Sequence, residues 1–485
     1  MISCDVYSII SHENHSQNRK IIQRSRSFQP IVEVARRTYN RYLARMKNVD
    51  TLMHARWVIP VTADNPRLPH HSIAVHDGRI VDILPTPDAL LEYAAHATFD
   101  YAEHALMPGL INAHTHAAMS LFRGLADDIA LMDWLQNHIW PAEAKWVNEE
   151  FVQAGTELAV AEMLRGGTTC FNDMYFFPDV TGRVARKAGM RACVGMIVID
   201  FPTVWAGDAD EYLDRGIAVH DSFRNDDLIT TCFAPHAPYT VSDAPLEKIR
   251  SYAHEMDVPV TIHLHETAHE VEQAVQQNGM RPIQRLNAIG LVSPSLIAVH
   301  MTQLEPAEIE LLAASGSHVV HCPESNLKLA SGFCPVSTLL DAGINVAIGT
   351  DGAASNNDLD MFSEMRTAAL LAKGVAGNPE ALPADVALRM ATINGARALG
   401  LDGKTGSLEI GKEADIVAVK FDTIETTPVY DPVSHLVYSC GREQVSDVWI
   451  AGRHVMKNRV LTQLDEQNIR LQAQAWSRKI EIEDK

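Results

Sequence analysis

The chain has 485 residues, of which 46% are hydrophobic and 21% charged, and its formal net charge is −20. This composition is ordinary for a globular protein, and no apolar run reaches the roughly 18 residues that a membrane-spanning helix requires. The acidic balance argues against general nucleic-acid binding, because neutralising phosphates needs a basic surface. A small-molecule substrate fits this composition better.

The N-terminal segment differs in charge from the rest of the chain. Its first 49 residues hold nine basic and three acidic residues. It lacks a positively charged start followed by a continuous apolar stretch, which argues against a secretory signal, although an arginine-rich segment also resembles a transit peptide. We interpret residues 1–48 as a flexible basic extension.

Two stretches far apart in the chain show the pattern of short strands and turns. Residues 49–106 contain an Asp77-Gly78 turn between two alternating runs, which is typical of a β-hairpin, and residues 404–460 contain a second hairpin-like pattern. Neither stretch has enough strands to be stable alone. We therefore expect both to build one small β-sandwich-like domain, followed by a helical tail over residues 461–485.

Between these stretches, residues 107–403 alternate apolar strand-like runs with amphipathic helical segments. The runs cover residues 105–116, 167–177, 191–200, 228–238, 258–266, 296–301, 317–326 and 345–352. Eight repeats of strand and helix over about 300 residues predict an α/β fold of the (β/α)8 barrel type. A doubly wound sheet is the alternative, but its glycine-rich dinucleotide motif is absent after the first run.

Most of the runs end in a side chain that can bind metal or transfer protons. These are His114, His116, His236, His263, His265, Glu266, His300, His321 and Asp351. In a barrel all the carboxyl ends of the strands meet at one rim, so residues more than 200 positions apart converge there. The pattern therefore predicts a single site.

A metal site is the simplest interpretation of these side chains at the strand ends. His114 and His116 are two residues apart, so a strand directs both to the same face, where paired imidazoles can hold zinc. Alone, such a pair is most often two hydrogen-bonded surface histidines. Glu266 can shuttle a proton beside a metal-bound water, or it can cap the next helix; His300 can orient the nucleophile, or it can be a buried core histidine.

The full set of motifs resembles the amidohydrolase superfamily. The resemblance covers residues 49–460 and rests on PGLINAHTH, GTTCFNDMYF, APHAPYT, TIHLHET, IAVH, HCPESNLKLASG, IGTDGAASNN, MATINGARALG and GSLEIGKEADIVAV. It implies one divalent metal per subunit, zinc by preference, because the fourth run lacks the lysine that bridges two metals in binuclear relatives. The implied ligands are His114, His116, His263 and Asp351, with Glu266, His300 and Asp351 as the catalytic groups.

Within the superfamily the chain is most similar to the 5'-methylthioadenosine/S-adenosylhomocysteine deaminases of the triazine-hydrolase-like (TRZ/ATZ-type) branch. In residues 125–146 the resemblance implies that Trp134 lines the pocket and Glu143 holds the ribose diol. It also implies that His236 lies near the purine, and that Glu266 and Asp351 contact the substrate. No arginine follows the third run closely enough to bind a homocysteine carboxylate, which favours methylthioadenosine as the substrate.

The implied reaction is hydrolytic deamination at C6 of an adenine nucleoside, giving methylthioinosine, or S-inosylhomocysteine from the second substrate. The alternatives are an aminohydrolase acting on a free base or a triazine, such as a guanine deaminase, and a barrel that serves as a non-catalytic scaffold. The resemblance also implies a homo-oligomer.

Seven cysteines without C-x-x-C spacing predict reduced thiols and a cytoplasmic location.

Overall fold

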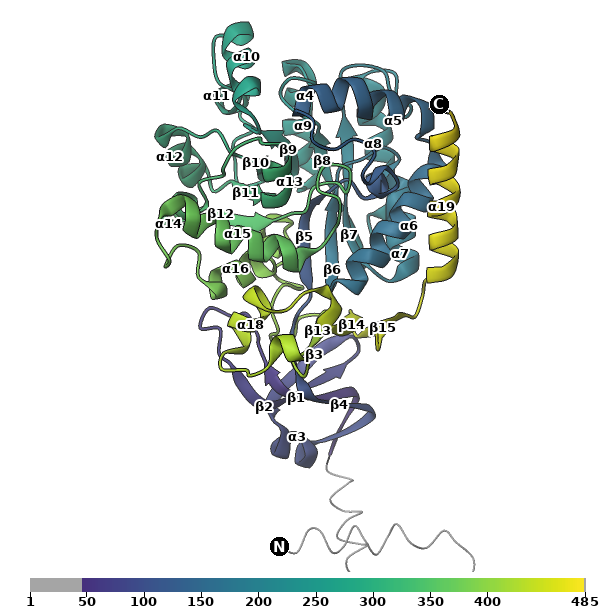
Figure 1. Cartoon of the computed structure of the whole chain (residues 1–485), viewed down its shortest axis with the longest axis vertical. Helices are drawn as coiled ribbons and strands as arrows, with labels where there is room; N and C mark the ends of the chain where they lie inside the picture. The colour runs from purple at the N-terminus through teal and green to yellow at the C-terminus, as the bar shows by residue number, and fades with distance from the viewer. Residues whose placement is uncertain (1–45, 484–485) are drawn as a thin grey trace, which may run out of the picture.

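The computed structural model describes residues 46–483, which form two eight-stranded sheets with helices packed around one of them (Figure 1). The predicted N-terminal extension, residues 1–48, lies outside the described residues up to residue 45. No helix within residues 46–483 is both long enough and apolar enough to cross a lipid bilayer.

One of these sheets is the predicted (β/α)8 barrel. Its strands pair in parallel and in chain order: β5 (Leu110–Thr115), β6 (Thr168–Asp173), β7 (Arg191–Val198), β8 (Ile229–Pro235), β9 (Val260–Leu264), β10 (Leu296–His300), β11 (His318–His321) and β12 (Asn345–Ile348). The amide of Asp351 donates to the carbonyl of His114 at 3.0 Å and so joins the chain after the last strand to the first one. These strands are buried on both faces, which explains their almost continuous apolar sequences.

Helices surround the barrel on its outer side. They are α6 (Glu149–Arg165), α7 (Pro178–Ala188), α8 (Ala209–Phe223), α9 (Asp243–Met256), α10 (Ala268–Asn278), α11 (Pro282–Ile289), α12 (Pro306–Ser315), α13 (Pro323–Lys328), α14 (Val336–Asp341), α15 (Met361–Ala376), α16 (Ala384–Met390) and α17 (Ile393–Ala398). Polar caps fix where several of them begin: the Asn148 side chain accepts from the Phe151 amide at α6, and Asp208 does the same for α8.

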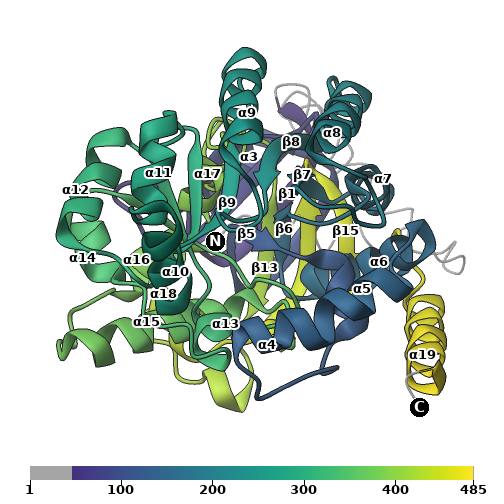
Figure 2. The same cartoon turned by 90° about the horizontal axis from the view of Figure 1, so that it is seen from above.

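The connection after β5 is the longest at the carboxyl rim and consists of short helices. It contains η2 (Ala117–Phe122), α4 (Leu131–Asp133), η3 (Trp134–Ile139) and α5 (Trp140–Trp146). Seen from above, α4 and α5 lie beside the centre of the barrel (Figure 2). The segment that carries Trp134 and Glu143 is therefore folded at the rim.

The other sheet belongs to the predicted small domain and is called the small sheet here; it combines both ends of the described chain, as the sequence predicts. Its strand order is β16 (Val460–Leu461), β15 (Arg453–Lys457), β14 (Val445–Ile450), β13 (Ile416–Lys420), β4 (Tyr93–Pro108), β1 (Lys47–Val58), β2 (Leu68–His76) and β3 (Arg79–Pro85). The Asp77-Gly78 turn joins β2 to β3 with positive φ at both residues. Short helices flank the sheet: α3 (Thr86–Glu92), η4 (Ile424–Thr426), α18 (Pro432–Tyr438) and η5 (Arg442–Gln444).

The last helix, α19 (Glu466–Glu483), returns from the small sheet and lies along α6 (Figure 1). Trp476 is buried there, with its ring 5.3 Å from that of Phe151 in an edge-on arrangement. The domain limits expected from the sequence stay a prediction. They assign 49–106 and 404–460 to the small domain, 107–403 to the barrel and 461–485 to the helical tail.

Candidate metal centre and active site

Four predicted ligands meet at the carboxyl rim of the barrel. His114 lies at the end of β5 and His116 just after it, His263 lies on β9, and Asp351 follows β12. One nitrogen or oxygen atom from each residue falls within a group whose members are all within 4.8 Å of one another. Residues separated by 237 positions in the sequence are thus brought together by closure of the barrel.

The distances between these atoms are those expected of ligands that share one cation such as zinc. Nε2 of His114 lies 3.1 Å from Nε2 of His263 and 3.4 Å from Oδ1 of Asp351, while Nε2 of His116 lies 3.1 Å from the same oxygen. Ligand bonds of about 2.0–2.2 Å that meet at angles of about 90–110° separate the ligand atoms by about 2.8–3.6 Å. Three imidazoles and one carboxylate are a donor set that suits catalytic zinc.

Neighbouring groups orient two of the ligands toward this centre. The Nδ1 of His116 donates to the carbonyl of Met174 at 2.6 Å, which leaves Nε2 free to bind a cation. Oδ2 of Asp351 accepts from the hydroxyls of Ser325 at 2.7 Å and Ser355 at 2.9 Å. The other carboxylate oxygen, Oδ1, is therefore the one that faces the histidines.

The electrostatics favour a neutral, metal-binding form of His263. This side chain is buried, and its burial, together with the neighbouring His114 and His236, lowers its pKa well below the ordinary value. A neutral imidazole keeps the lone pair that a metal ion needs.

Glu266 and His300 lie beside the four ligands. Nε2 of His300 is 3.8 Å from Oε2 of Glu266, and both side chains are buried. Burial raises the pKa of Glu266, which favours a carboxyl group that can both hold and release a proton.

The backbone at three strand ends has the left-handed conformation that residues other than glycine rarely adopt. The φ angles are +53° at His265, +74° at His300 and +62° at Asp351. Each such residue costs on the order of 1–3 kcal/mol, and strained residues of this kind cluster at functional sites. At Asp351 and His300 the strained backbone carries side chains of the predicted site.

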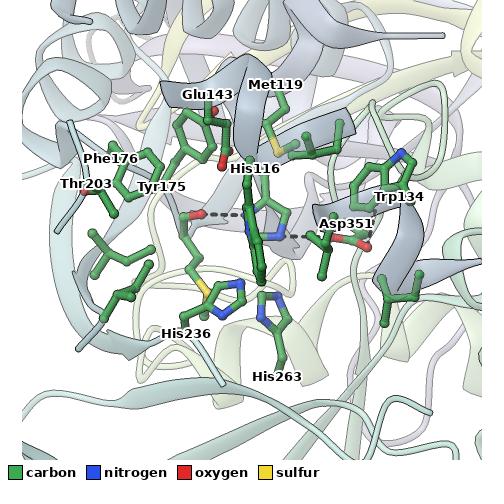
Figure 3. Close-up of a pocket in the computed structure, with 18 of the residues that line it drawn as sticks. His116, Met119, Trp134, Glu143, Tyr175, Phe176, Thr203, His236, His263 and Asp351 are labelled. Atoms are coloured by element: carbon green, nitrogen blue, oxygen red, sulfur yellow. Dashed lines mark hydrogen bonds and ion pairs between the residues drawn. The ribbon is translucent and has the colours of Figure 1, made fainter. Parts of the chain in front are cut away.

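A cavity of about 480 Å³ is lined by three of the four predicted ligands. Trp134 and Glu143, from the connection after β5, line it together with His116, His263 and Asp351 (Figure 3). Burial raises the pKa of Glu143 to about 7. The structure thus brings the predicted substrate residues to the predicted metal ligands.

His236 lines the same cavity at the end of β8. Its Nδ1 lies 3.0 Å from the hydroxyl of Thr240, and its ring centre is 5.0 Å from that of His263. Burial lowers its pKa to about 3, so its imidazole is neutral. Its position beside the metal ligands agrees with a group that contacts a bound heterocycle.

Two strand-end histidines do not join this group. The His265 ring turns away and contacts the carbonyl of Gln303 at 2.9 Å and the amide of Ile283 at 3.1 Å, and His321 is buried outside the cavity lining. His265 comes after the end of β9, and its backbone has the left-handed φ of +53°, so the two-residue period that would direct it to the same face as His263 no longer applies.

Sequence reasoning missed the partners of the acid and base groups. Ser325, Asn326 and Ser331 contact Asp351, His300 and Glu266 respectively. The signal was present in HCPESNLKLASG, where buried polar residues follow directly on the seventh strand, but spacing alone assigns them no role.

Comparison with known proteins gives a consistent result. The model of the amidohydrolase family matches residues 105–455. A protein of Saccharophagus degradans named 5-methylthioadenosine/S-adenosylhomocysteine deaminase is 50% identical over 90% of this chain and 97% of its own length. A protein of the same name from Teredinibacter turnerae is 50% identical over 89% of this chain and 98% of its own length.

Among solved structures, an adenosine deaminase of Xanthomonas campestris with bound zinc is 54% identical and superposes with a TM-score of 0.89. The match covers 90% of this chain and all of that one. The barrel, the ligand set and these similarities agree, and the chain belongs to the amidohydrolase family.

Proposed function

We propose that this protein is a zinc-dependent aminohydrolase that deaminates an adenine nucleoside at C6, with 5'-methylthioadenosine as the main substrate and S-adenosylhomocysteine as a second one. The observation that carries the proposal is one cavity lined by three of the four predicted metal ligands, by the two acid/base groups Glu266 and His300, and by Trp134 and Glu143. The names of the relatives from Saccharophagus and Teredinibacter support the same substrate class.

His114, His116, His263 and Asp351 would hold the metal ion. When bound there, zinc lowers the pKa of a coordinated water molecule toward neutrality. Asp351 and His300 orient the attacking water and accept its proton. Glu266 donates a proton to the ring nitrogen next to C6, which makes that carbon more electrophilic, and the proton taken from the water passes to the amino group, which leaves as ammonia.

The nucleoside is recognised by groups on the opposite side of the cavity. Glu143 binds the two ribose hydroxyls, because a carboxyl group offers two oxygens to adjacent hydroxyls. The Trp134 indole packs against the purine or the thioether, and the neutral His236 lies near the purine.

The wall around the remaining space is apolar. It includes Trp140, Ile199, Phe201 and Val204, and among residues 46–483 no lysine or arginine lines the cavity. The more distant candidate, Arg215, lies on α8 and pairs with Glu211 at 2.6 Å. A charged homocysteine tail would find no cation here, which supports methylthioadenosine as the preferred substrate.

A substrate panel tests the proposal. The purified protein loaded with zinc should release ammonia from methylthioadenosine fastest, then from S-adenosylhomocysteine or adenosine, and slowly or not at all from guanine and triazines. Activity confined to guanine or triazines would favour the free-base alternative. A protein that binds zinc but releases no ammonia from any member of the panel would favour a scaffold role.

The cellular setting is also part of the proposal. The family resemblance supports a homo-oligomer, which light scattering of the purified protein would test. The six described cysteines are all unpaired, which supports a reducing compartment such as the cytoplasm. Microscopy of the tagged protein in its own cells would test this location.

A further inference from the structure

One short segment contacts all three of the acid/base groups assigned above. It consists of Ser325–Ser331, begins inside α13 directly after β11, and is named here the clamp segment. The side chains of Ser325, Asn326 and Ser331 are at most 4% exposed. They are buried polar groups to which the proposed reaction assigns no role.

The three contacts reach the ends of three different strands. The hydroxyl of Ser325 donates to Oδ2 of Asp351 at 2.7 Å, after β12. Asn326 Oδ1 lies 2.8 Å from Nδ1 of His300, at the end of β10. The hydroxyl of Ser331 donates to Oε1 of Glu266 at 3.3 Å, after β9.

The contact between Asn326 and His300 determines which ring nitrogen carries the proton. In this contact Oδ1 of Asn326 is the acceptor and Nδ1 of His300 the donor, while Nδ2 of Asn326 is buried without a partner among the described residues. Nε2 then keeps its lone pair, and this is the nitrogen that lies 3.8 Å from Glu266. The imidazole is thereby oriented as a base toward the reaction centre.

The clamp segment is itself held by the surrounding loops. The amide of Ser331 donates to the carbonyl of Asn326 at 2.9 Å, and the carbonyl of Ser331 accepts from the side chains of Thr302 and Gln303 at 3.2 and 3.0 Å. At its start, the amide of Glu324 donates to the buried carboxyl group of Glu364 at 3.3 Å. The three contacts therefore come from an anchored piece of chain rather than from a free loop.

From this arrangement we infer that the clamp segment is a positioning element that sets the orientation of Asp351, His300 and Glu266 together, with Asn326 selecting the tautomer of His300. This inference rests on the proposed function for the roles of those three groups. The clamp residues act through the groups they contact and not on the substrate.

The decisive pair of variants is Asn326→Leu and Asn326→Asp. Leucine has a similar size but no acceptor, so kcat should fall by about 100-fold or more while KM and bound zinc change little. Aspartate restores an acceptor for Nδ1 and should recover most of kcat. Ser337→Ala on α14, whose hydroxyl has no partner among the described residues, is the control and should leave kcat unchanged.

A crystal structure of the Asn326→Leu variant provides a readout that does not depend on activity. The His300 ring should be rotated or present in more than one orientation. An unrotated ring together with wild-type kcat would overturn the inference, as would a leucine variant no worse than the aspartate variant. Failure of the proposed function would give a different result. The wild-type protein would then deaminate no nucleoside, although the His300 ring would still be rotated in the Asn326→Leu variant.

Discussion

Buried charged and polar groups occur at both ends of the barrel, but they are arranged in opposite ways. At the amino end, Arg191 of β7 and Asp415, which precedes β13, are each 1% exposed in their side chains, and they form a two-point ion pair at 3.0 and 3.1 Å. Asp415 also accepts from the hydroxyl of Thr405 and the amide of Ala451. Every charge there meets its complement, and the result joins the barrel to the small sheet.

At the carboxyl end, groups of the same kind converge. The imidazole nitrogens of two predicted metal ligands, His114 and His263, lie 3.1 Å apart, and the backbone at His300 and Asp351 is strained. Such an arrangement does not stabilise the fold by itself and becomes favourable when a cation is bound. The comparison teaches that complementary buried charges indicate a structural role, whereas converging donors of one kind indicate a functional one.

The largest expected effect follows from removing a metal ligand. His114→Ala should abolish stoichiometric zinc binding and lower kcat/KM by about 1,000-fold or more, since metal catalysis contributes several kcal/mol. Metal analysis and ammonia release measure both quantities. The exposed His138→Ala is the matched control. If the His114→Ala protein kept its zinc and its activity, the carboxyl end of the barrel would not be the metal site.

Replacing the proton donor should separate chemistry from metal binding. Glu266→Gln keeps the size of the side chain but cannot transfer a proton, so kcat should fall by about 10²- to 10⁴-fold while the zinc content stays at one per subunit. Steady-state kinetics on methylthioadenosine provide the measurement. Loss of zinc in this variant would instead assign Glu266 to the metal site.

The amino end should respond in stability rather than in chemistry. Arg191→Met leaves the buried Asp415 unpaired and should lower the free energy of unfolding by about 3–5 kcal/mol, with normal kcat for the protein that remains folded. Arg186, whose side chain is 52% exposed and pairs with Asp226, offers a control, because Arg186→Met should cost less than about 1 kcal/mol. Denaturant unfolding compares the two, and a normal melting curve with reduced kcat for Arg191→Met would contradict the structural assignment.

The smallest expected effect concerns the wall of the cavity. Glu143→Ala should raise KM for nucleosides by about 10- to 100-fold, because hydrogen bonds to a carboxylate contribute about 1.5–3 kcal/mol. Adenosine and 2',3'-dideoxyadenosine should then differ far less in KM than they do with the wild-type protein. If the variant still distinguished the two as strongly as the wild type, the ribose assignment would fail.

Much of the fold could be predicted because its signals are local. Eight apolar runs separated by amphipathic helices indicate a barrel, and the Asp77-Gly78 turn marks a hairpin that the structure contains. His114 and His116 share a strand face by their spacing alone. Their convergence with His263 and Asp351 followed from the general rule that the strand ends of a barrel meet at one rim.

The orientation of each side chain could not be predicted in the same way. His263 and His265 look equivalent in the sequence, yet only His263 faces the cavity. The contact of Asn326 with His300 joins two residues from different strand ends, and no spacing rule connects them.

The sequence by itself determined the alternation of strands and helices, the residue types at the strand ends and the family to which these motifs belong, because these depend on local periodicity and on the chemistry of single side chains. Only the tertiary structure decided which of those side chains face one another, which nitrogen of His300 contacts Asn326, and that Ser325–Ser331 contacts all three acid/base groups. Such contacts depend on the closure of the barrel and on strained backbone at three strand ends, which are properties of the whole fold.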